Sequence, residues 1–201
     1  MAAPRPTLDR ESAVWANGQL LVGVDEAGRG PLAGPVVAAA VVFPAGSALL
    51  EGVRDSKTLS AARREALALL IRGAALAVGV AGASVREIDG LNIRVATALA
   101  MRRAIVRVLT RVPASPLPRL LLDGHSMREI GFPHEALVDG DAHCHSVAAA
   151  GIIAKTVRDR LMRRLAARHA GYGWERNSGY GSAEHFAAIQ TLGPTDHHRR
   201  S

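Results

Sequence analysis

The sequence predicts an α/β fold in which a mixed five-stranded sheet is flanked by helices and followed by a small C-terminal appendage. Three observations support this prediction. Short apolar runs recur between polar turns, as expected of buried strands. Longer segments carry apolar residues at helical spacing and alternate with those runs. From residue 171 the composition shifts to glycine and aromatic residues, which predicts a separate loop and helix over 171–201.

The strands are predicted from apolar runs that are bounded by turn formers. Residues 20–24 and 36–43 are continuous apolar runs, which is typical of strands buried on both faces. The run at 74–83 is weaker because glycines interrupt it. The runs at 119–122 and 136–138 are short, and each is followed by an aspartate and a glycine.

Helices are predicted where capping residues precede apolar residues at helical spacing. Ser60 is placed to cap one helix, and Ser84 with Glu87 matches a capping box. In the longest predicted helix four arginines are expected away from the apolar face, namely Arg158, Arg163, Arg164 and Arg168. The predicted helices span residues 60–72, 84–90, 93–111, 146–169 and 182–191.

The composition fits one globular domain with a sizeable core, since 48% of the 201 residues are hydrophobic. The single cysteine, Cys144, excludes an internal disulfide and is typical of the reducing cytoplasm, where we expect the protein to act. Residues 1–18 lack an apolar core, so we expect a disordered arm rather than a signal peptide. The longest apolar run, 36–43, is too short to cross a bilayer, and no membrane role is expected.

The charge of the chain favours a polyanionic partner such as nucleic acid, because the net charge is +7 and the isoelectric point is near 10.8. A basic surface that serves only solubility is the alternative. Of the 25 basic residues 23 are arginine, and the only lysines are Lys57 and Lys155. Because a lysine ammonium is compact and flexible, these two exceptions are candidates for contacts to phosphate or carboxylate groups.

The turn between the first two predicted strands concentrates residues that are typical of a site. Asp25 and Glu26 end the first strand, and a glycine-rich segment follows them as far as Pro35. Carboxylates can bind a cation, and glycine backbone can approach a ligand closely. Gly28 and Gly30 have the spacing of a dinucleotide-binding loop, but such a loop opens into a helix, which the prolines and the following strand oppose.

Acidic residues recur at three predicted strand ends: Asp25 with Glu26, Asp123, and Asp141 or its neighbour Asp139. If these strands lie side by side, the carboxylates converge and repel one another unless divalent cations such as Mg²⁺ or Mn²⁺ neutralise them. Two such ions can activate a water and stabilise the leaving oxygen of a phosphodiester. The alternative for each acid is a turn former or a helix cap.

Motifs that run in order from about residue 20 to the last residue resemble those of bacterial ribonuclease HII. They are long and specific, which makes the resemblance strong. The matching segments are Asp25-Glu26-Ala27-Gly28-Arg29-Gly30, Asp55-Ser56-Lys57, Asp123-Gly124, Gly140-Asp141, Ser146-Val147-Ala148-Ala149-Ala150, Ala154-Lys155, Arg158-Asp159, Gly179-Tyr180 and His197-His198-Arg199-Arg200-Ser201.

The resemblance implies a ribonuclease H-like fold, with a catalytic domain over 19–170 and a substrate-contacting loop and helix over 171–201. Members of the family use two divalent cations, Mg²⁺ or Mn²⁺, to hydrolyse the phosphodiester on the 5′ side of a ribonucleotide. Their substrates are RNA/DNA hybrids and duplex DNA that contains single ribonucleotides. The reaction starts the removal of ribonucleotides from DNA.

Carried over by motif, the catalytic, metal-binding acids are Asp25, Glu26, Asp123 and Asp141. The family's Gly-Asp pair before a helix of small residues selects Asp141 over Asp139. Because consecutive strand residues point to opposite faces, Asp25 and Glu26 can bind the same ions only if the strand bends as it enters the turn. The glycine that follows favours such a bend.

The resemblance also implies the substrate contacts, which are Gly28, Arg29, Gly30, Lys57 and Tyr180. In the family the Gly-Arg-Gly backbone reads the ribose 2′-hydroxyl, the group that distinguishes RNA from DNA. The tyrosine packs against the sugar on the DNA side of the junction, with a structural aromatic as the alternative. Lys57 is expected to contact a phosphate, whereas an ion pair with Asp159 one helical turn away explains Lys155 almost as well.

Two departures from the family pattern bear on substrates and partners. Many members have His-Lys before the Gly-Tyr pair, whereas this chain has Asn177 and Ser178, so a phosphate contact is missing there. The chain also ends at Ser201, where many relatives continue, and no clamp-binding peptide of the kind that archaeal relatives carry is visible. We expect a monomer.

The sequence also allows other interpretations. Ribonuclease HIII shares the fold but lacks the junction preference, and its usual extra N-terminal domain finds no room in this chain. A noncatalytic nucleic-acid-binding module would gain by losing the four acids. A zinc site at His143, Cys144 and His145 lacks a fourth ligand. His197 and His198 are expected either to contact phosphates or to lie in an exposed tail.

Overall fold

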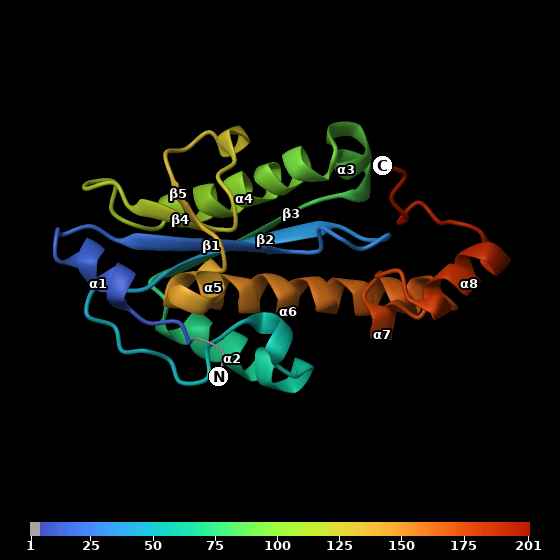
Figure 1. The fold of residues 1–201 in the computed structure, drawn as a ribbon, viewed down its shortest axis with the longest axis horizontal. Helices are drawn as coiled ribbons and strands as arrows, with labels where there is room; N and C mark the ends of the chain where they lie inside the picture. The colour runs from blue at the N-terminus through green and yellow to red at the C-terminus, as the bar shows by residue number, and fades with distance from the viewer. Residues whose placement is uncertain (1–4) are drawn as a thin grey trace.

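The computed structural model describes residues 5–201 and contains a mixed five-stranded sheet between helices (Figure 1). The strands are β1 (Leu21–Ala27), β2 (Val36–Val42), β3 (Ala77–Ala83), β4 (Arg119–Asp123) and β5 (Glu135–Leu137). They lie in the order β3-β2-β1-β4-β5; β1, β2 and β3 pair antiparallel, whereas β4 pairs parallel with β1 and β5. The predicted strands and the mixed sheet are confirmed.

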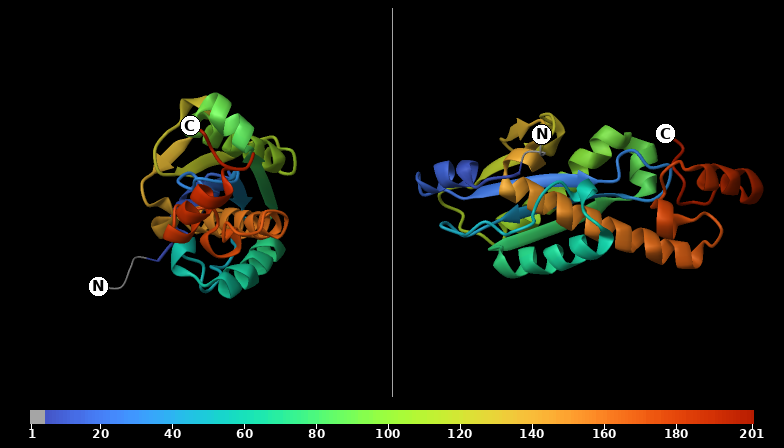
Figure 2. Two further views of the ribbon diagram at one scale, coloured as in Figure 1. Left: turned by 90° about the vertical axis from the view of Figure 1, so that its right-hand side faces the viewer. Right: turned by 60° about the horizontal axis from the view of Figure 1, so that its bottom comes forward.

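Helices cover both faces of the sheet, with α4 (Ile93–Leu109) on one face and α6 (His145–Arg168) and α2 (Ala61–Ala74) on the other (Figures 1 and 2). Ser60 accepts a hydrogen bond from the Arg63 amide at the start of α2, and the capping box of Ser84 and Glu87 is present at the start of α3. The helices are α1 (Asp9–Trp15), α2 (Ala61–Ala74), α3 (Val85–Leu91), α4 (Ile93–Leu109), α5 (Gly140–His143), α6 (His145–Arg168), α7 (Trp174–Asn177) and α8 (Ala183–Leu192), with short 3₁₀ turns η1 (Ser56–Thr58) and η2 (Arg128–Ile130).

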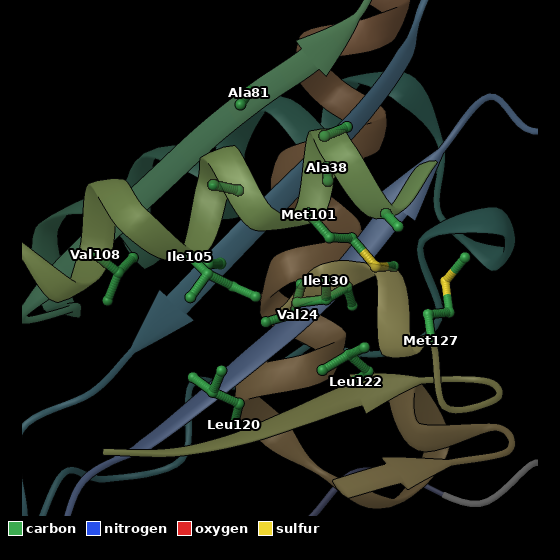
Figure 3. Close-up of a cluster of buried hydrophobic side chains, with 14 of the residues drawn as sticks. Val24, Ala38, Ala81, Met101, Ile105, Val108, Leu120, Leu122, Met127 and Ile130 are labelled. Carbon is green, nitrogen blue, oxygen red and sulfur yellow. The ribbon is translucent and has the colours of Figure 1, made fainter. Parts of the chain in front are cut away.

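The core is built from aliphatic side chains on both sides of the sheet. Between α4 and the sheet, Met101 and Ile105 pack against Val24 and Leu122 in one buried cluster (Figure 3). On the opposite face α6 and α2 contribute Ile152 and other small or branched side chains, which pack against β2. Small residues on β2 and α6 let these layers approach closely, because a core with few aromatic rings fills its volume through short separations.

The close approach is greatest where α6 crosses β1. A Cβ atom at Gly23 would lie 2.2 Å from the backbone carbonyl carbon of Ser146, so only glycine fits at this point of the strand. The start of α6 therefore packs backbone against backbone on β1. This contact fixes where the end of β1 stands relative to α6.

The N-terminal segment differs from the disordered arm that was expected over residues 1–18. Residues 9–15 form α1, and residues 1–4 lie outside the described part of the chain. Glu11 is fully buried, and its Oε1 accepts hydrogen bonds from the Ser146 amide (2.7 Å), the Ser146 hydroxyl (2.8 Å) and the Cys144 thiol (3.2 Å). The free amides at the start of α6 need an acceptor, and Glu11 supplies it across 135 positions of sequence.

No helix within residues 5–201 is both long enough and apolar enough to cross a membrane.

Replacing Glu11 with alanine is expected to lower the free energy of unfolding by about 3 kcal/mol, because three buried donors at the start of α6 lose their acceptor. Urea unfolding followed by circular dichroism measures this. Ser12→Ala, at an exposed position of the same helix, serves as the control and is expected to change stability by no more than about 0.5 kcal/mol. Equal stability of the Glu11→Ala variant and the wild type would contradict the docking of α1.

Candidate active site

The four predicted acids come from three neighbouring elements. Val24 on β1 pairs with Leu122 on β4, so the residues that follow them, Asp25 and Asp123, stand side by side on parallel strands. Asp123 Oδ1 accepts a hydrogen bond from the Gly140 amide (2.8 Å), which ties the start of α5 to the end of β4. Asp141, the next residue of α5, is thereby held close to Asp123. Asp139, the alternative, is exposed.

The first strand does not bend at the two acids as was expected. Regular antiparallel pairing continues through Glu26 with Ala38 and Ala27 with Val37. Asp25 and Glu26 therefore leave opposite faces of β1, and Asp25 points toward α6. The physical reason is that β2 offers backbone hydrogen-bond partners beyond the acids, so strand pairing continues past the apolar residues of β1.

The charges of these acids influence one another strongly. Burial, followed by the charges of Glu26 and Asp123, raises the pKa of Asp25 well above its ordinary value. Burial also raises the pKa of Glu26, although Arg29, whose Nη1 lies 3.5 Å from Glu26 Oε1, opposes the increase. Burial and then the charge of Asp123 raise the pKa of Asp141 to about 6. The four acids thus share one neighbourhood that disfavours their combined negative charge.

This donor set fits hard divalent cations. Carboxylate oxygens are the ligands that Mg²⁺ and Mn²⁺ prefer, and a divalent ion would offset both the burial and the mutual repulsion that raise these pKa values. Within residues 5–201, no three side chains of His, Cys, Asp or Glu are already gathered as ligands of one ion. The opposite directions of Asp25 and Glu26 are consistent with that open arrangement.

A glycine on α6 makes room for one of the acids. A Cβ atom at Gly151 would lie 2.3 Å from Asp25 Oδ2, so the carboxylate occupies the space that any larger residue would fill. Asp25 is only 8% exposed as a result. Sequence reasoning did not select Gly151, although a glycine in the middle of a predicted helix signals such a close contact.

The ammonium group of Lys57 is attracted by the charges of the acids. The residue sits in η1, where Asp55 Oδ1 accepts a hydrogen bond from its backbone amide (2.9 Å). Partial burial disfavours its charge, but the combined attraction of Asp55, Asp25, Asp141 and Asp123 raises the pKa of Lys57. The structure therefore places this ammonium near the acids.

A buried arginine donates hydrogen bonds to backbone carbonyls of the glycine-rich loop between β1 and β2. Arg158 donates from its guanidinium to the carbonyl oxygens of Pro35 (3.0 Å), Ala33 (3.1 Å) and Ser178 (2.9 Å). It is fully buried, which corrects the expectation that it lies away from the buried face of its helix. A guanidinium can be buried where several carbonyls converge on its donors, and these carbonyls come from distant segments.

Arg199, near the end of the chain, binds the same loop from the same side. Its guanidinium donates to the carbonyl oxygens of Gly28 (2.5 Å), Arg29 (2.8 Å) and Gly34 (2.8 Å). By contrast, the backbone N–H groups of Gly28, Arg29 and Gly30 donate no hydrogen bond to any of residues 5–201. The amides of Arg29 and Gly30 follow carbonyls that Arg199 binds, so these two donors point away from the guanidinium.

Tyr180 lies beside this loop and is 45% exposed. A Cβ atom at Gly30 would lie 3.9 Å from Tyr180 Cε1, and the Nζ atom of Lys155 lies 5.8 Å from the centre of the ring. The backbone carbonyl of Tyr180 is bonded to His185 Nδ1 (2.8 Å). The structure therefore brings Tyr180 together with the predicted Gly-Arg-Gly segment.

Asn177 and Ser178, which replace His-Lys of many relatives, stabilise the turn before Tyr180. The Asn177 side-chain oxygen accepts a hydrogen bond from the Gly179 amide (2.8 Å), and the Ser178 hydroxyl donates to Asp159 (3.2 Å). Asp159 also forms the expected ion pair with Lys155 (2.8 Å). These residues contribute to the shape of the loop rather than an additional cation.

The C-terminal residues pack against the glycine-rich loop instead of forming an exposed tail. His198 is buried and forms a β-bridge with Ala33, and the Gly34 amide donates to the His197 carbonyl (2.8 Å). His198 Nε2 also lies 3.1 Å from His185 Nε2. The sequence did not predict this packing because the loop residues that contact His197 and His198 lie more than 160 positions earlier in the chain.

The histidines and the cysteine before α6 point to different places. Cys144 donates to Glu11, and burial raises the pKa of its thiol. His145 Nε2 accepts a hydrogen bond from the Leu50 amide (3.2 Å), whereas His143 is exposed. The three side chains therefore do not converge on a zinc ion.

The chain is similar to known proteins over nearly its whole length. Residues 22–201 match the family described as Ribonuclease HII. A relative named Ribonuclease HII from Ruegeria pomeroyi is 52% identical over 98% of this chain and 82% of its own length. Another of that name from Rhodospirillum rubrum is 50% identical over 98% of this chain and 88% of its own length.

Solved structures share the fold. The ribonuclease HII in a PCNA complex from Archaeoglobus fulgidus aligns with a TM-score of 0.74 and 28% identity, over 90% of this chain and 94% of that chain. The ribonuclease H2 from Pyrococcus horikoshii aligns with a TM-score of 0.72 and 26% identity, over 90% and 92%. The expected ribonuclease H-like fold is therefore confirmed.

About half of the residues are identical to those of curated relatives, and the acids of β1, β4 and α5 lie close together in a shared fold. The chain therefore belongs to the ribonuclease HII family and is an endoribonuclease that cleaves the RNA of RNA/DNA hybrids.

Proposed function

We propose that this enzyme hydrolyses the phosphodiester on the 5′ side of a ribonucleotide, both in RNA/DNA hybrids and at single ribonucleotides within duplex DNA. The observation that supports this most directly is the pairing of the acid cluster with a glycine loop whose amides are unused. A nuclease that reads single ribonucleotides needs both features next to each other. Such an enzyme would start ribonucleotide removal in the cytoplasm of a bacterial cell.

Asp25, Glu26, Asp123 and Asp141 are proposed to hold two divalent cations, Mg²⁺ or Mn²⁺. When bound, these ions would supply an activated water and neutralise charge on the phosphate. The chain itself contributes the positions of its carboxylates: β1 and β4 place Asp25 beside Asp123, and the Gly140 amide aligns the latter. No side-chain nucleophile is required for water to attack phosphorus.

Recognition of the ribose is proposed for the loop of Gly28, Arg29 and Gly30. A 2′-hydroxyl can accept a hydrogen bond from a backbone amide, and glycine allows the sugar to approach the backbone. Tyr180, whose ring is exposed next to Gly30, is proposed to pack against the neighbouring deoxyribose. Lys57 is proposed to contact a phosphate, since its ammonium lies where a phosphate would approach the acids.

A noncatalytic nucleic-acid-binding module is the rival function. An adhesive surface for a polyanion would not gather acids whose pKa values are raised by burial and then by their mutual repulsion. A junction-blind nuclease is the second rival. The test is cleavage of labelled duplexes with one ribonucleotide, with a continuous RNA strand, or with DNA only. A metal-dependent nick 5′ to the single ribonucleotide supports the proposal, cleavage of the continuous hybrid alone supports the second rival, and no cleavage supports the module.

Asp123→Asn is expected to reduce nicking of the single-ribonucleotide duplex by at least about 10³-fold while duplex binding survives, because bound metal ions supply several kcal/mol of charge stabilisation. The asparagine oxygen can still accept the Gly140 amide, so the fold is retained. Asp139→Asn is the matched control, since Asp139 is exposed and its positive φ of 54° suits asparagine. Nicking by Asp123→Asn at the wild-type rate would show that the metal assignment is wrong.

Gly151→Ala is expected to lower kcat by at least about tenfold, because the new methyl group displaces the Asp25 carboxylate. Single-turnover nicking measures the effect, and circular dichroism checks that helix content is kept. Gly73→Ala, where an added Cβ meets nothing within 4 Å, is the matched control and is expected to keep full activity. A fully active Gly151→Ala variant would contradict the role of Asp25.

The raised pKa values of the acids predict a pH-dependent effect of metal ions on stability. In the metal-free protein the folded state binds more protons than the unfolded state between the ordinary pKa of aspartate and the pKa of about 6 at Asp141. Stability without metal is therefore expected to fall as the pH rises through that window. Millimolar Mn²⁺ or Mg²⁺ competes with those protons for the carboxylates. The increase in Tm that the metal causes is therefore expected to be larger at about pH 7.5 than at about pH 5.

Differential scanning fluorimetry with chelator or with metal, at both pH values, measures this difference. The Asp123→Asn variant is expected to show a smaller metal-dependent increase in Tm. An increase that is equal at both pH values would contradict the assignment of the ions to these acids.

A further inference from the structure

Arg199 makes its contacts at the two peptide units that carry the proposed ribose-reading amides. Nη2 donates to the Gly28 carbonyl (2.5 Å) and Nη1 to the Arg29 carbonyl (2.8 Å). Nε and Nη2 also bind the Gly34 carbonyl, at 3.0 and 2.8 Å, so the guanidinium bridges both ends of the loop. One side chain thereby connects the two ends of the turn.

Peptide geometry converts these contacts into a direction for the amides. In a planar trans peptide the C=O of one residue and the N–H of the next point in opposite directions. Fixing the Gly28 carbonyl on Arg199 therefore aims the Arg29 amide away from Arg199, and fixing the Arg29 carbonyl aims the Gly30 amide likewise. These two amides have no acceptor within residues 5–201.

The backbone around Arg199 is itself firmly held. Its amide donates to the Leu32 carbonyl (2.8 Å), and the neighbouring His198 forms a β-bridge with Ala33. His198 also contacts His185, which is bonded to the carbonyl of Tyr180. The C-terminal segment thus connects the glycine loop to the segment that carries Tyr180.

We propose that Arg199 is a positioning residue for substrate selection, which aims the amides of Arg29 and Gly30 at the ribose 2′-hydroxyl. This inference rests on the proposed function of the loop. Arg199 does not touch the substrate itself, since its donors are engaged by three carbonyls on the inner side of the loop. Burial, reinforced by the nearby charge of Arg158, lowers the pKa of Arg199 to about 10, so it remains charged at neutral pH.

Arg199→Ala and Arg199→Lys test this role, with Arg200→Ala as the matched control. Arg200 is the exposed neighbour, and its backbone amide donates a hydrogen bond to Asp89. For each variant two quantities are measured: kcat/KM for nicking a duplex with one ribonucleotide, and the inhibition constant of an all-DNA duplex of the same sequence. The ratio of the two reports selection for the 2′-hydroxyl rather than general duplex affinity.

Arg199→Ala is expected to reduce kcat/KM by about 10²-fold, because a small misplacement of recognition groups is costly, while the inhibition constant of the DNA duplex stays within about twofold. Arg199→Lys keeps the charge but lacks the planar guanidinium that binds three carbonyls. Its kcat/KM is therefore expected to lie between those of Arg199→Ala and the wild type. Arg200→Ala is expected to match the wild type in both quantities.

A purely structural role would give a different result. In that case Arg199→Ala would lower the Tm, and kcat/KM per folded enzyme and the affinity for the all-DNA duplex would fall in proportion. An unchanged ratio in folded Arg199→Ala overturns the inference. If that variant does not fold, Arg199→Lys decides in the same way, since an unchanged ratio there also overturns it. Failure of the wild type to prefer the ribonucleotide duplex would instead refute the proposed function.

Discussion

The backbone contact between α6 and β1 is the constraint on which the rest of the structure depends. It requires glycine at position 23, and it places Gly151 of α6 directly over Asp25. The same helix carries Arg158 to the back of the glycine loop, and its first turn is capped by the buried Glu11. Each of these features would move if the layers separated by the width of one methyl group, because tightly packed interiors transmit such shifts.

The site combines acids that repel one another with a loop whose carbonyl oxygens accept hydrogen bonds from arginine side chains. The negative groups stand near the ends of β1 and β4 and at the start of α5, whereas the guanidinium groups of Arg158 and Arg199 bind the loop carbonyls. Neither set can relax independently, since the acids are held by strand pairing and the arginines by several carbonyls each. A rigid scaffold therefore keeps groups of unfavourable charge close together, as preorganised sites require.

Local signals in the sequence predicted most elements, and long-range contacts account for what was missed. The capping box of Ser84 and the apolar run of β2 depend only on neighbouring residues, so both could be predicted. The acids were selected because they follow predicted strand ends and match the motifs of the family, which also chose Asp141 over Asp139. Helix α1, the burial of Arg158 and the packing of Arg199 depend on partners more than 100 positions away, which no local pattern indicates. The expected bend at Glu26 was wrong because strand pairing with β2 continues past it.

The near absence of lysine has a practical consequence for chemical labelling. Both lysines of the chain lie next to proposed substrate-site residues: Lys57 is close to the acids, and Lys155 lies beside the ring of Tyr180. The remaining basic side chains are guanidinium groups, which amine-selective reagents leave unmodified. Among the side chains, such a reagent therefore modifies only these two lysines of the proposed substrate site. Protection of their amines by a bound duplex would show directly how the nucleic acid lies across the enzyme.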